Sequence, residues 1–178
     1  DGRPVCSRYP VHVVQRTASA LPPGHAIIED MHTDVVVVGA GIAGLIAART
    51  LKEAGISGLV LDKRRAGGGR MATRSIGTHR FDHGAQHFAA RSPEVIELAQ
   101  DWKTAGVLRK WFRAENGTDR LVGVGGMRRI PEFVAGPLEV RTAVTVQRLE
   151  VADHKVRVLT DRDTPVTAQA VVMTPPLP

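Results

Sequence analysis

A run of valines that ends in three spaced glycines constrains the fold more than any other feature of this sequence. Residues 34–45 read DVVVVGAGIAGL, which joins a β-branched stretch, the spacing GxGxxG and the apolar start of a helix. A continuous apolar strand is typical of a parallel sheet that is buried on both faces. Glycines at Gly39, Gly41 and Gly44 directly after such a strand predict a loop that binds the pyrophosphate of a dinucleotide.

The residues after this loop complete a βαβ unit. A helix is expected over 42–54, where apolar and polar positions alternate with helical spacing and Gly55 supplies the stop. Residues 58–62 (GLVLD) read as a second strand that ends in Asp62. A carboxylate at this point accepts hydrogen bonds from adenosine ribose hydroxyls and repels a 2′-phosphate. The pattern therefore disfavours NADP and leaves both NAD and FAD open.

A basic, glycine-rich block follows the second strand. Residues 63–74 read KRRAGGGRMATR, in which a glycine turn ends in Arg70. Such a turn offers backbone amides and a guanidinium to a pyrophosphate, whereas a domain that binds only NAD normally continues into a plain helix. The block therefore favours FAD. It also belongs to a cluster of six basic residues that equals the net charge of +6: Lys63, Arg64, Arg65, Arg70, Arg74 and Arg80.

Taken together, these motifs resemble those of the FAD-dependent amine-oxidase superfamily, and most closely its renalase-type branch and the related bacterial NAD/FAD-dependent oxidoreductases. The matching segments are GAGIAGL, the acidic residue and lysine at 62–63, Arg65, GGRMATR at 68–74, FDHGAQ at 81–86, Val122-Gly123-Val124, Gly126-Met127 and Thr174-Pro175. They span most of residues 34–176 and correspond to the N-terminal portion of the family's chains. The sequence departs from the family at Ala66, His87 and Gly125, where glycine, tyrosine and proline are common.

The resemblance implies non-covalent FAD as the cofactor and a set of residues that contact it. The glycine loop would meet the pyrophosphate and Asp62 the adenosine ribose. Arg70, with Arg65 nearby, would contact the phosphates or the ribityl chain, and the turn at 84–87 would lie by the isoalloxazine ring. The full set is Gly39, Gly41, Ile42, Ala43, Gly44, Asp62, Lys63, Arg65, Gly69, Arg70, Met71, Gly84, Ala85, Gln86, His87 and Val146, the last through its backbone near adenine. The resemblance assigns no catalytic residue.

The fold class that we predict is α/β, with a parallel Rossmann-like sheet and without the family's C-terminal substrate half. Further predicted elements are helices over 93–105 and 127–135, a β-meander crossover at about 138–160 and a strand over 168–173. Residues 31–178 are interpreted as one truncated FAD-binding domain that starts at Met31. Residues 1–30 are interpreted as a non-native or disordered extension, with an extra strand at 11–14 as the alternative.

The function that the resemblance implies is flavin-dependent oxidation. Hydride would pass from a reduced substrate, such as a dihydronicotinamide or an amine, to FAD and then to oxygen. The first alternative is a non-catalytic FAD- or NAD-binding fragment of a larger flavoprotein. The second is nucleic-acid binding through the basic cluster, which is disfavoured because no aromatic residue is interleaved with that cluster before Phe81. The expected partner is therefore a small-molecule substrate, such as one related to NAD(P)H, and neither a nucleic acid nor a membrane.

Several residue types exclude other classes of site. The longest apolar runs are far shorter than the ~20 residues of a membrane-spanning helix, so we expect a cytoplasmic protein. Cys6 is the only cysteine, which excludes an intrachain disulfide.

His79, His83 and His87 have helical spacing, but the residues between them favour a strand, so no metal site is expected. Asp82 is expected to anchor a turn through backbone amides. Core packing is the expected role of both tryptophans, Trp102 and Trp111.

Overall fold

The computed structural model of the protein describes residues 31–162 and 164–174. The predicted N-terminal extension at 1–30 lies outside the described residues. Two compact units make up the chain, and each is described by itself. The first, which we call the sheet unit, contains the described residues up to Gly67 and from Pro137 onward. The second, which we call the inserted unit, is Gly68–Gly136.

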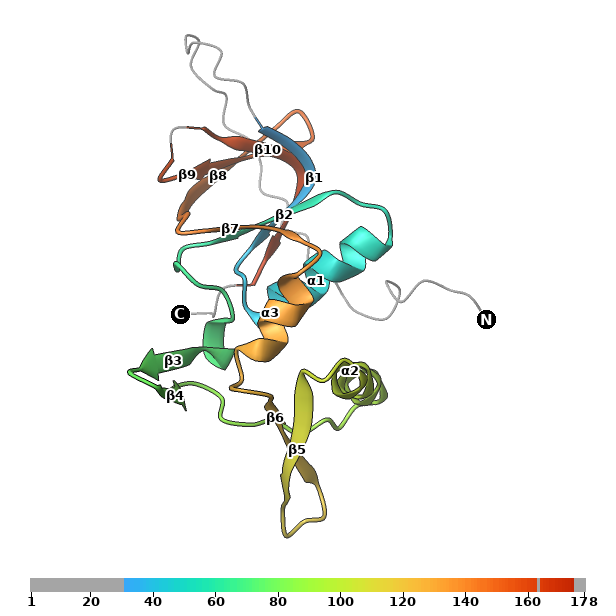
Figure 1. The fold of residues 1–178 in the computed structure, drawn as a ribbon. Helices are drawn as coiled ribbons and strands as arrows, with labels where there is room; N and C mark the ends of the chain where they lie inside the picture. Colours follow the sequence, from blue (N-terminus) through green and yellow to red (C-terminus); the bar gives the residue numbers. More distant parts are fainter. Residues whose placement is uncertain (1–30, 163, 175–178) are drawn as a thin grey trace. The chain divides into compact units, whose positions relative to one another are not determined.

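A six-stranded sheet with the order β7-β2-β1-β10-β9-β8 forms the sheet unit (Figure 1). Its strands are β1 Met31–Val38, β2 Gly58–Asp62, β7 Glu139–Thr142, β8 Val146–Ala152, β9 Lys155–Thr160 and β10 Val166–Met173. Strands β7, β2, β1 and β10 run parallel to one another, as predicted for a Rossmann-like sheet. Their carboxyl ends therefore meet at one edge, which is where open parallel sheets bind ligands.

The apolar run of β1 is buried from both sides. Val36 joins a core cluster whose buried members are Leu59, Leu61, Val158, Val166 and Ala168. Val37 and Val60 are equally inaccessible to solvent, and α1 (Ile42–Glu53) packs beside β1 and β2 with its own buried residue Leu45. Because successive side chains of a strand point to opposite faces, a strand covered on both faces has no position for a polar residue.

The predicted β-meander is present, but the first of its predicted strands belongs to the parallel part of the sheet. Strands β8 and β9 pair antiparallel and lead to β10, which pairs antiparallel with β9. Residues 139–142 instead form β7, which pairs in parallel with β2 at the edge of the sheet. Sequence alternation reports which residues of a strand are buried and does not identify the neighbouring strand, so this pairing was not visible in the sequence.

Two β-hairpins and two helices make up the inserted unit (Figure 1). Its elements are the 3₁₀ turn η2 Gly69–Met71, β3 Thr73–Ile76, β4 His79–Asp82, α2 Pro93–Thr104, β5 Leu108–Arg113, β6 Asp119–Gly123 and α3 Arg129–Ala135. Helix α2 begins as predicted, since the Ser92 side chain accepts a hydrogen bond from the Val95 amide. Its buried Trp102 packs edge-on against Phe88 at a ring separation of 6.4 Å.

The β5–β6 hairpin was not predicted from the sequence. Its turn contains Asn116-Gly117, and Gly117 has a positive φ of 73°. An Asn-Gly pair between two β-rich runs is a strong hairpin signal, so the information was present in the sequence. Within the described residues, no helix is both long and apolar enough to cross a bilayer.

Candidate functional site

Two of the three glycines in the loop after β1 are required by the protein's own packing. Gly39 has a φ of +109°, and a Cβ atom there would lie 2.6 Å from the hydroxyl oxygen of Thr174. A Cβ atom on Gly44 would collide with the carbonyl oxygen of Gly39 and would also crowd Thr174. Thr174 itself is fixed, because its backbone N–H and its hydroxyl both donate to the Val38 carbonyl at 3.0 Å. The end of β10 therefore packs directly against the loop.

Gly41 differs from the other two glycines because no atom of the described residues would contact a side chain there. Its φ and ψ of −76° and 170° are accessible to any residue. A Cβ atom on Gly41 would meet no atom within 4 Å. The residue is the N-cap of α1 and makes no side-chain cap, and the first turn of α1 contains no acidic residue. A helix start without a side-chain cap or an acidic residue suits the approach of an anionic group to its backbone amides.

Asp62 lies at the end of β2 and holds the loop in place. One carboxylate oxygen accepts the Ala40 amide at 2.7 Å, and the other accepts the Arg64 amide at 2.8 Å. The sequence predicted a contact with ribose and did not predict this role in the loop. A carboxylate has about four lone-pair positions. Both of these amides together therefore leave acceptor capacity for the hydroxyls of a ligand.

The other predicted residues of the sheet unit surround the same edge. Ile42 and Ala43 form the first turn of α1. Lys63 and Arg65 follow β2 and are exposed. Val146 begins β8, two residues after Val144, whose amide donates to the Asp62 carbonyl at 3.0 Å. The structure thus places the glycine loop, Asp62, Lys63 and Arg65 at the ends of β1 and β2, whereas Val146 pairs with Thr160 of β9.

In the inserted unit, the predicted turns at 68–71 and 84–87 contact each other. The Arg70 carbonyl accepts the Ala85 amide at 2.7 Å, and a Cβ atom on Gly84 would overlap with that carbonyl oxygen. Gly69 has a positive φ of 55°, and Met71 is buried. The Arg70 side chain is exposed, as is Gln86. The contact fixes the backbones of the two motifs together and leaves their polar side chains free to meet a ligand.

His87 lies in a cluster of aromatic rings. Its ring centroid is 5.8 Å from that of Trp111 and 5.8 Å from that of Phe112, and these two rings are 5.1 Å apart. Its Nδ1 is buried and has no hydrogen-bond partner among the residues that the structure describes. The prediction that Trp111 packs in the core is wrong, because half of Trp111 is exposed, whereas the same prediction for Trp102 is confirmed.

Asp82 has the structural role that the sequence predicted. Its Oδ1 accepts hydrogen bonds from the Thr73 hydroxyl at 2.5 Å and from the Met127 amide at 3.0 Å. The Thr73 hydroxyl oxygen in turn accepts the Arg128 amide at 3.1 Å. Gly126 has a φ of +123° and sits against Thr73. This network locks the β3–β4 hairpin to the start of α3, so part of the family-like pattern maintains the fold.

His79 and His83 lie in the segment for which the sequence predicted a strand and not a helix. His79 begins strand β4 and His83 directly follows it, and both side chains are exposed. The expectation that this segment is extended is confirmed. Across the described ranges, no group of three or more His, Cys, Asp or Glu side chains is placed to hold a metal ion.

Comparison with known proteins finds similarity to flavin-containing enzymes. A family model described as a NAD(P)-binding Rossmann-like domain matches residues 37–102, and a model described as a flavin-containing amine oxidoreductase matches residues 103–178. The flavin-containing amine oxidase of Oncorhynchus mykiss is 38% identical over 69 residues, which is 38% of this chain and 13% of that protein. The putrescine oxidase of Kocuria rosea is 41% identical over 68 residues, which is 38% of this chain and 14% of that protein.

Solved structures show the same fold at low sequence identity. A putrescine oxidase determined with bound putrescine superposes with a TM-score of 0.69 at 16% identity. The match covers 83% of this chain and 59% of the other. The chain therefore spans only part of the length of the proteins that it matches.

Proposed function

Since the chain belongs to the superfamily of flavin-containing amine oxidoreductases, of which it matches the N-terminal portion and whose cofactor is FAD, we propose that it forms the FAD-binding part of an oxidase. The proposed reaction removes a hydride from a reduced small molecule, an amine or a dihydronicotinamide. FAD supplies the chemistry when it is bound, since it accepts the two electrons of the hydride and passes them to O₂, which leaves as hydrogen peroxide. The protein binds and orients the reactants.

The observation that carries the proposal is the open position at Gly41. Thr174 and the loop itself account for Gly39 and Gly44, whereas no atom of the described residues occupies the space that a side chain on Gly41 would fill, and a ligand could approach there. The amides at the start of α1, including those of Ile42 and Ala43, would donate to the pyrophosphate of FAD. Asp62 would accept the ribose hydroxyls, and its negative charge opposes a 2′-phosphate at this place.

We assign the inserted unit a second set of cofactor contacts. The exposed guanidinium of Arg70 would form charge-assisted hydrogen bonds with phosphate oxygens. The turn of Gly84, Ala85, Gln86 and His87 would lie by the isoalloxazine ring, and its contact with the Arg70 backbone supports a shared role. The remaining proposed contacts are Lys63, Arg65, Gly69, Met71 and the backbone of Val146. Asp82 and Thr73 are left out of this set because their hydrogen bonds stay within the protein.

Two observations support different hydride donors. The motifs at 68–74 and 81–86 support the renalase-type branch, for which a dihydronicotinamide would be the hydride donor. The amine oxidase relatives support an amine instead. We also propose a cytoplasmic location and a small-molecule partner rather than a nucleic acid or a membrane.

Anaerobic reduction of the flavin tests the proposed function. The purified chain is loaded with FAD and mixed without oxygen with reduced nicotinamide mononucleotide or with benzylamine. Bleaching of the flavin absorbance by either donor, and its return when air is admitted, is the expected result. Retention of FAD without bleaching by either donor would instead support the alternative function, a non-catalytic FAD-binding fragment.

A further inference from the structure

The β5–β6 hairpin presents two chemically different faces. In an antiparallel pair, residues opposite each other point to the same side. Leu108, Lys110 and Arg113 pair with Gly123, Leu121 and Asp119, and this side includes the buried Leu121. A pocket on this side is lined jointly by Leu121, Asp119 and residues of α2. The first face of the hairpin is therefore the one that packs towards α2.

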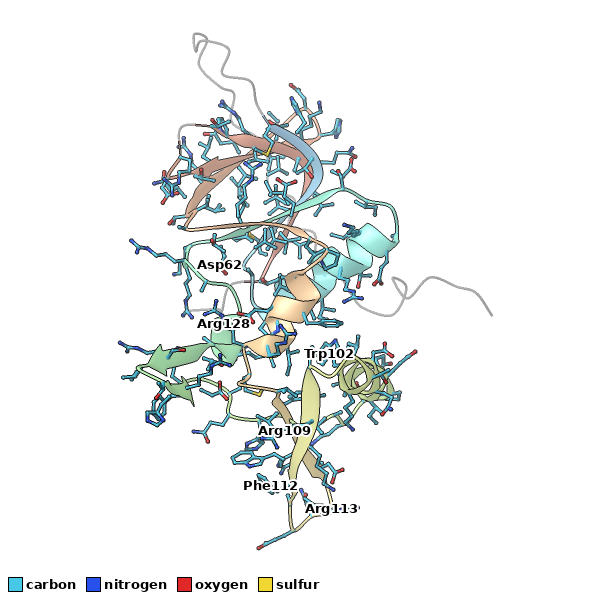
Figure 2. All side chains as sticks on the ribbon, in the orientation of Figure 1. Asp62, Trp102, Arg109, Phe112, Arg113 and Arg128 are labelled. Atoms are coloured by element: carbon cyan, nitrogen blue, oxygen red, sulfur yellow. The ribbon has the colours of Figure 1, made fainter. Side chains whose placement is uncertain are left out.

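A β-bulge places two consecutive aromatic residues together on the second face. The pairing shifts between Lys110 and Phe112, so that Trp111 is the extra residue on β5. Phe112 then pairs with Arg120, and Arg109 pairs with Val122. Without the shift, Trp111 and Phe112 would point to opposite sides of the strand, whereas their rings lie 5.1 Å apart. Figure 2 shows the Phe112 side chain on the side of β5 away from α2.

This second face, which we call the aromatic face, consists of Arg109, Trp111, Phe112, Arg120 and Val122, with the His87 ring against both aromatic rings. Trp111 is 50% exposed and Phe112 is 42% exposed. Exposure of two neighbouring large aromatic rings indicates a binding surface rather than a scattered apolar residue. His87 connects this surface to the turn at 84–87.

The charge of the aromatic face is positive. Arg109 and Arg120 are its charged residues, and the register places no carboxylate of the described hairpin strands on it. The acidic residue Asp119 lies on the first face, where it forms an ion pair with Lys110 at 2.7 Å. Two guanidinium groups beside exposed rings attract a planar ligand that carries a negative charge and repel one that carries a positive charge.

We propose that the aromatic face binds the reacting substrate and selects a planar ring that carries an anionic group. The inference rests on the proposed function, because it needs the turn at 84–87 to lie by the flavin ring. His87 would then stand between the cofactor and the two aromatic residues. Trp111 and Phe112 stack on the substrate ring, and Arg109 and Arg120 hold its anionic group. Between the two proposed donors, this face favours a dihydronicotinamide that carries a phosphate over an amine, which carries a positive charge.

Calorimetric titration of the FAD-loaded chain with three small probes tests the selection. Benzoate has a ring and a negative charge, butyrate has the charge without an aromatic ring, and benzylamine has the ring with a positive charge. Benzoate is expected to bind more tightly than the other two. Trp111→Ala and Phe112→Ala are each expected to weaken benzoate binding by roughly tenfold, as for other stacked rings, whereas Trp111→Phe retains most of it.

Ile96→Ala is the matched control, since Ile96 is 52% exposed on α2 and is absent from the aromatic face. It is expected to leave benzoate binding unchanged, and all variants are expected to retain FAD. Tighter binding of benzylamine than of benzoate would overturn the proposed charge selection. Lack of binding by every probe would overturn the site and indicate that another segment or a second copy covers the face. Failure of the unmodified chain to retain FAD would contradict the proposed function instead, which separates the two ideas.

Discussion

The glycine loop of the sheet unit and the paired turns of the inserted unit each contain two kinds of residue. Some are fixed by contacts within the protein, and others are left exposed. In the loop, Gly39 and Gly44 fit against the protein and Gly41 faces open space. In the turns, the backbones of Arg70 and Gly84 fit against each other and the Arg70 side chain is exposed. The loop thus offers a ligand its backbone amides, whereas the turns offer a charged side chain. In both segments, the contacts within the protein identify residues that maintain the fold, and the exposed groups identify residues that are available to bind a ligand.

The largest expected effect comes from the scaffold of the loop. Gly44→Ala would push a methyl group into the backbone carbonyl of Gly39, which cannot be relieved by rotating a side chain. We expect a loss of about 3 kcal/mol in the free energy of unfolding, at the upper end of overpacking effects. Urea denaturation measures it, with Gly41→Ala as the control that changes stability by less than about 0.5 kcal/mol. Equal losses in the two variants would remove the distinction between the two glycines.

The scaffold of the inserted unit is tested at Asp82. Asp82→Ala removes the acceptor of the Thr73 hydroxyl and the Met127 amide. A donor left without a partner costs about 1–3 kcal/mol, and we expect a loss of stability in that range. Asp82→Asn, which keeps an acceptor oxygen, should lose less. If thermal melts showed no difference between Asp82→Ala and the unmodified chain, the network would have no role in holding β3–β4 against α3.

The exposed part of the inserted unit is tested by comparing two arginines. Arg70→Ala is expected to weaken FAD retention by roughly tenfold or more, as the loss of a charge-assisted hydrogen bond would. Arg74→Ala is expected to have a smaller effect, because Arg74 lies on β3 opposite Phe81. Equilibrium dialysis with FAD measures both. Equal losses would argue against a specific contact of Arg70 with the phosphates.

The smallest effect is expected at Asp34, in the middle of β1, where it contacts Ser57 just before β2. Asp34 accepts hydrogen bonds from the Ser57 hydroxyl and amide, and these lower the pKa of Asp34. A lowered folded pKa means that this contribution to stability is present above the unfolded value of about 3.9 and is lost as the pH falls below it. Asp34→Asn should therefore reduce the Tm slightly at pH 7, and the difference should shrink near pH 3. A difference that does not change with pH would contradict this account, and FAD binding should be unaffected throughout.

The sequence predicted most of the sheet unit because its signals are local. The valines of 35–38 and the three glycines specify strand, loop and helix within a short stretch, and the order of β1, α1 and β2 follows directly. The parallel pairing of β7 with β2 was missed, since it joins residues about eighty positions apart and has no local pattern.

The sequence identified the candidate site residues by their type, and the structure added the contacts that they make within the protein. Asp62 was expected to meet ribose, and the structure adds its hydrogen bond to the Ala40 amide. Trp111 was expected in the core, because apolar content does not reveal a bulge that turns a side chain outward. Thr174 was part of the family-like pattern, but its fit against Gly39 and Gly44 depends on the end of β10 lying beside the loop.

Titration of the chain and of its Gly41→Ala variant with FAD and with NAD tests the central claim most directly. The account predicts that the unmodified chain binds FAD more tightly than NAD. It also predicts that Gly41→Ala keeps its thermal stability and loses FAD affinity by roughly tenfold or more, because the methyl group occupies the space of the pyrophosphate. Unchanged FAD affinity in the variant, or binding of NAD without binding of FAD, would contradict it.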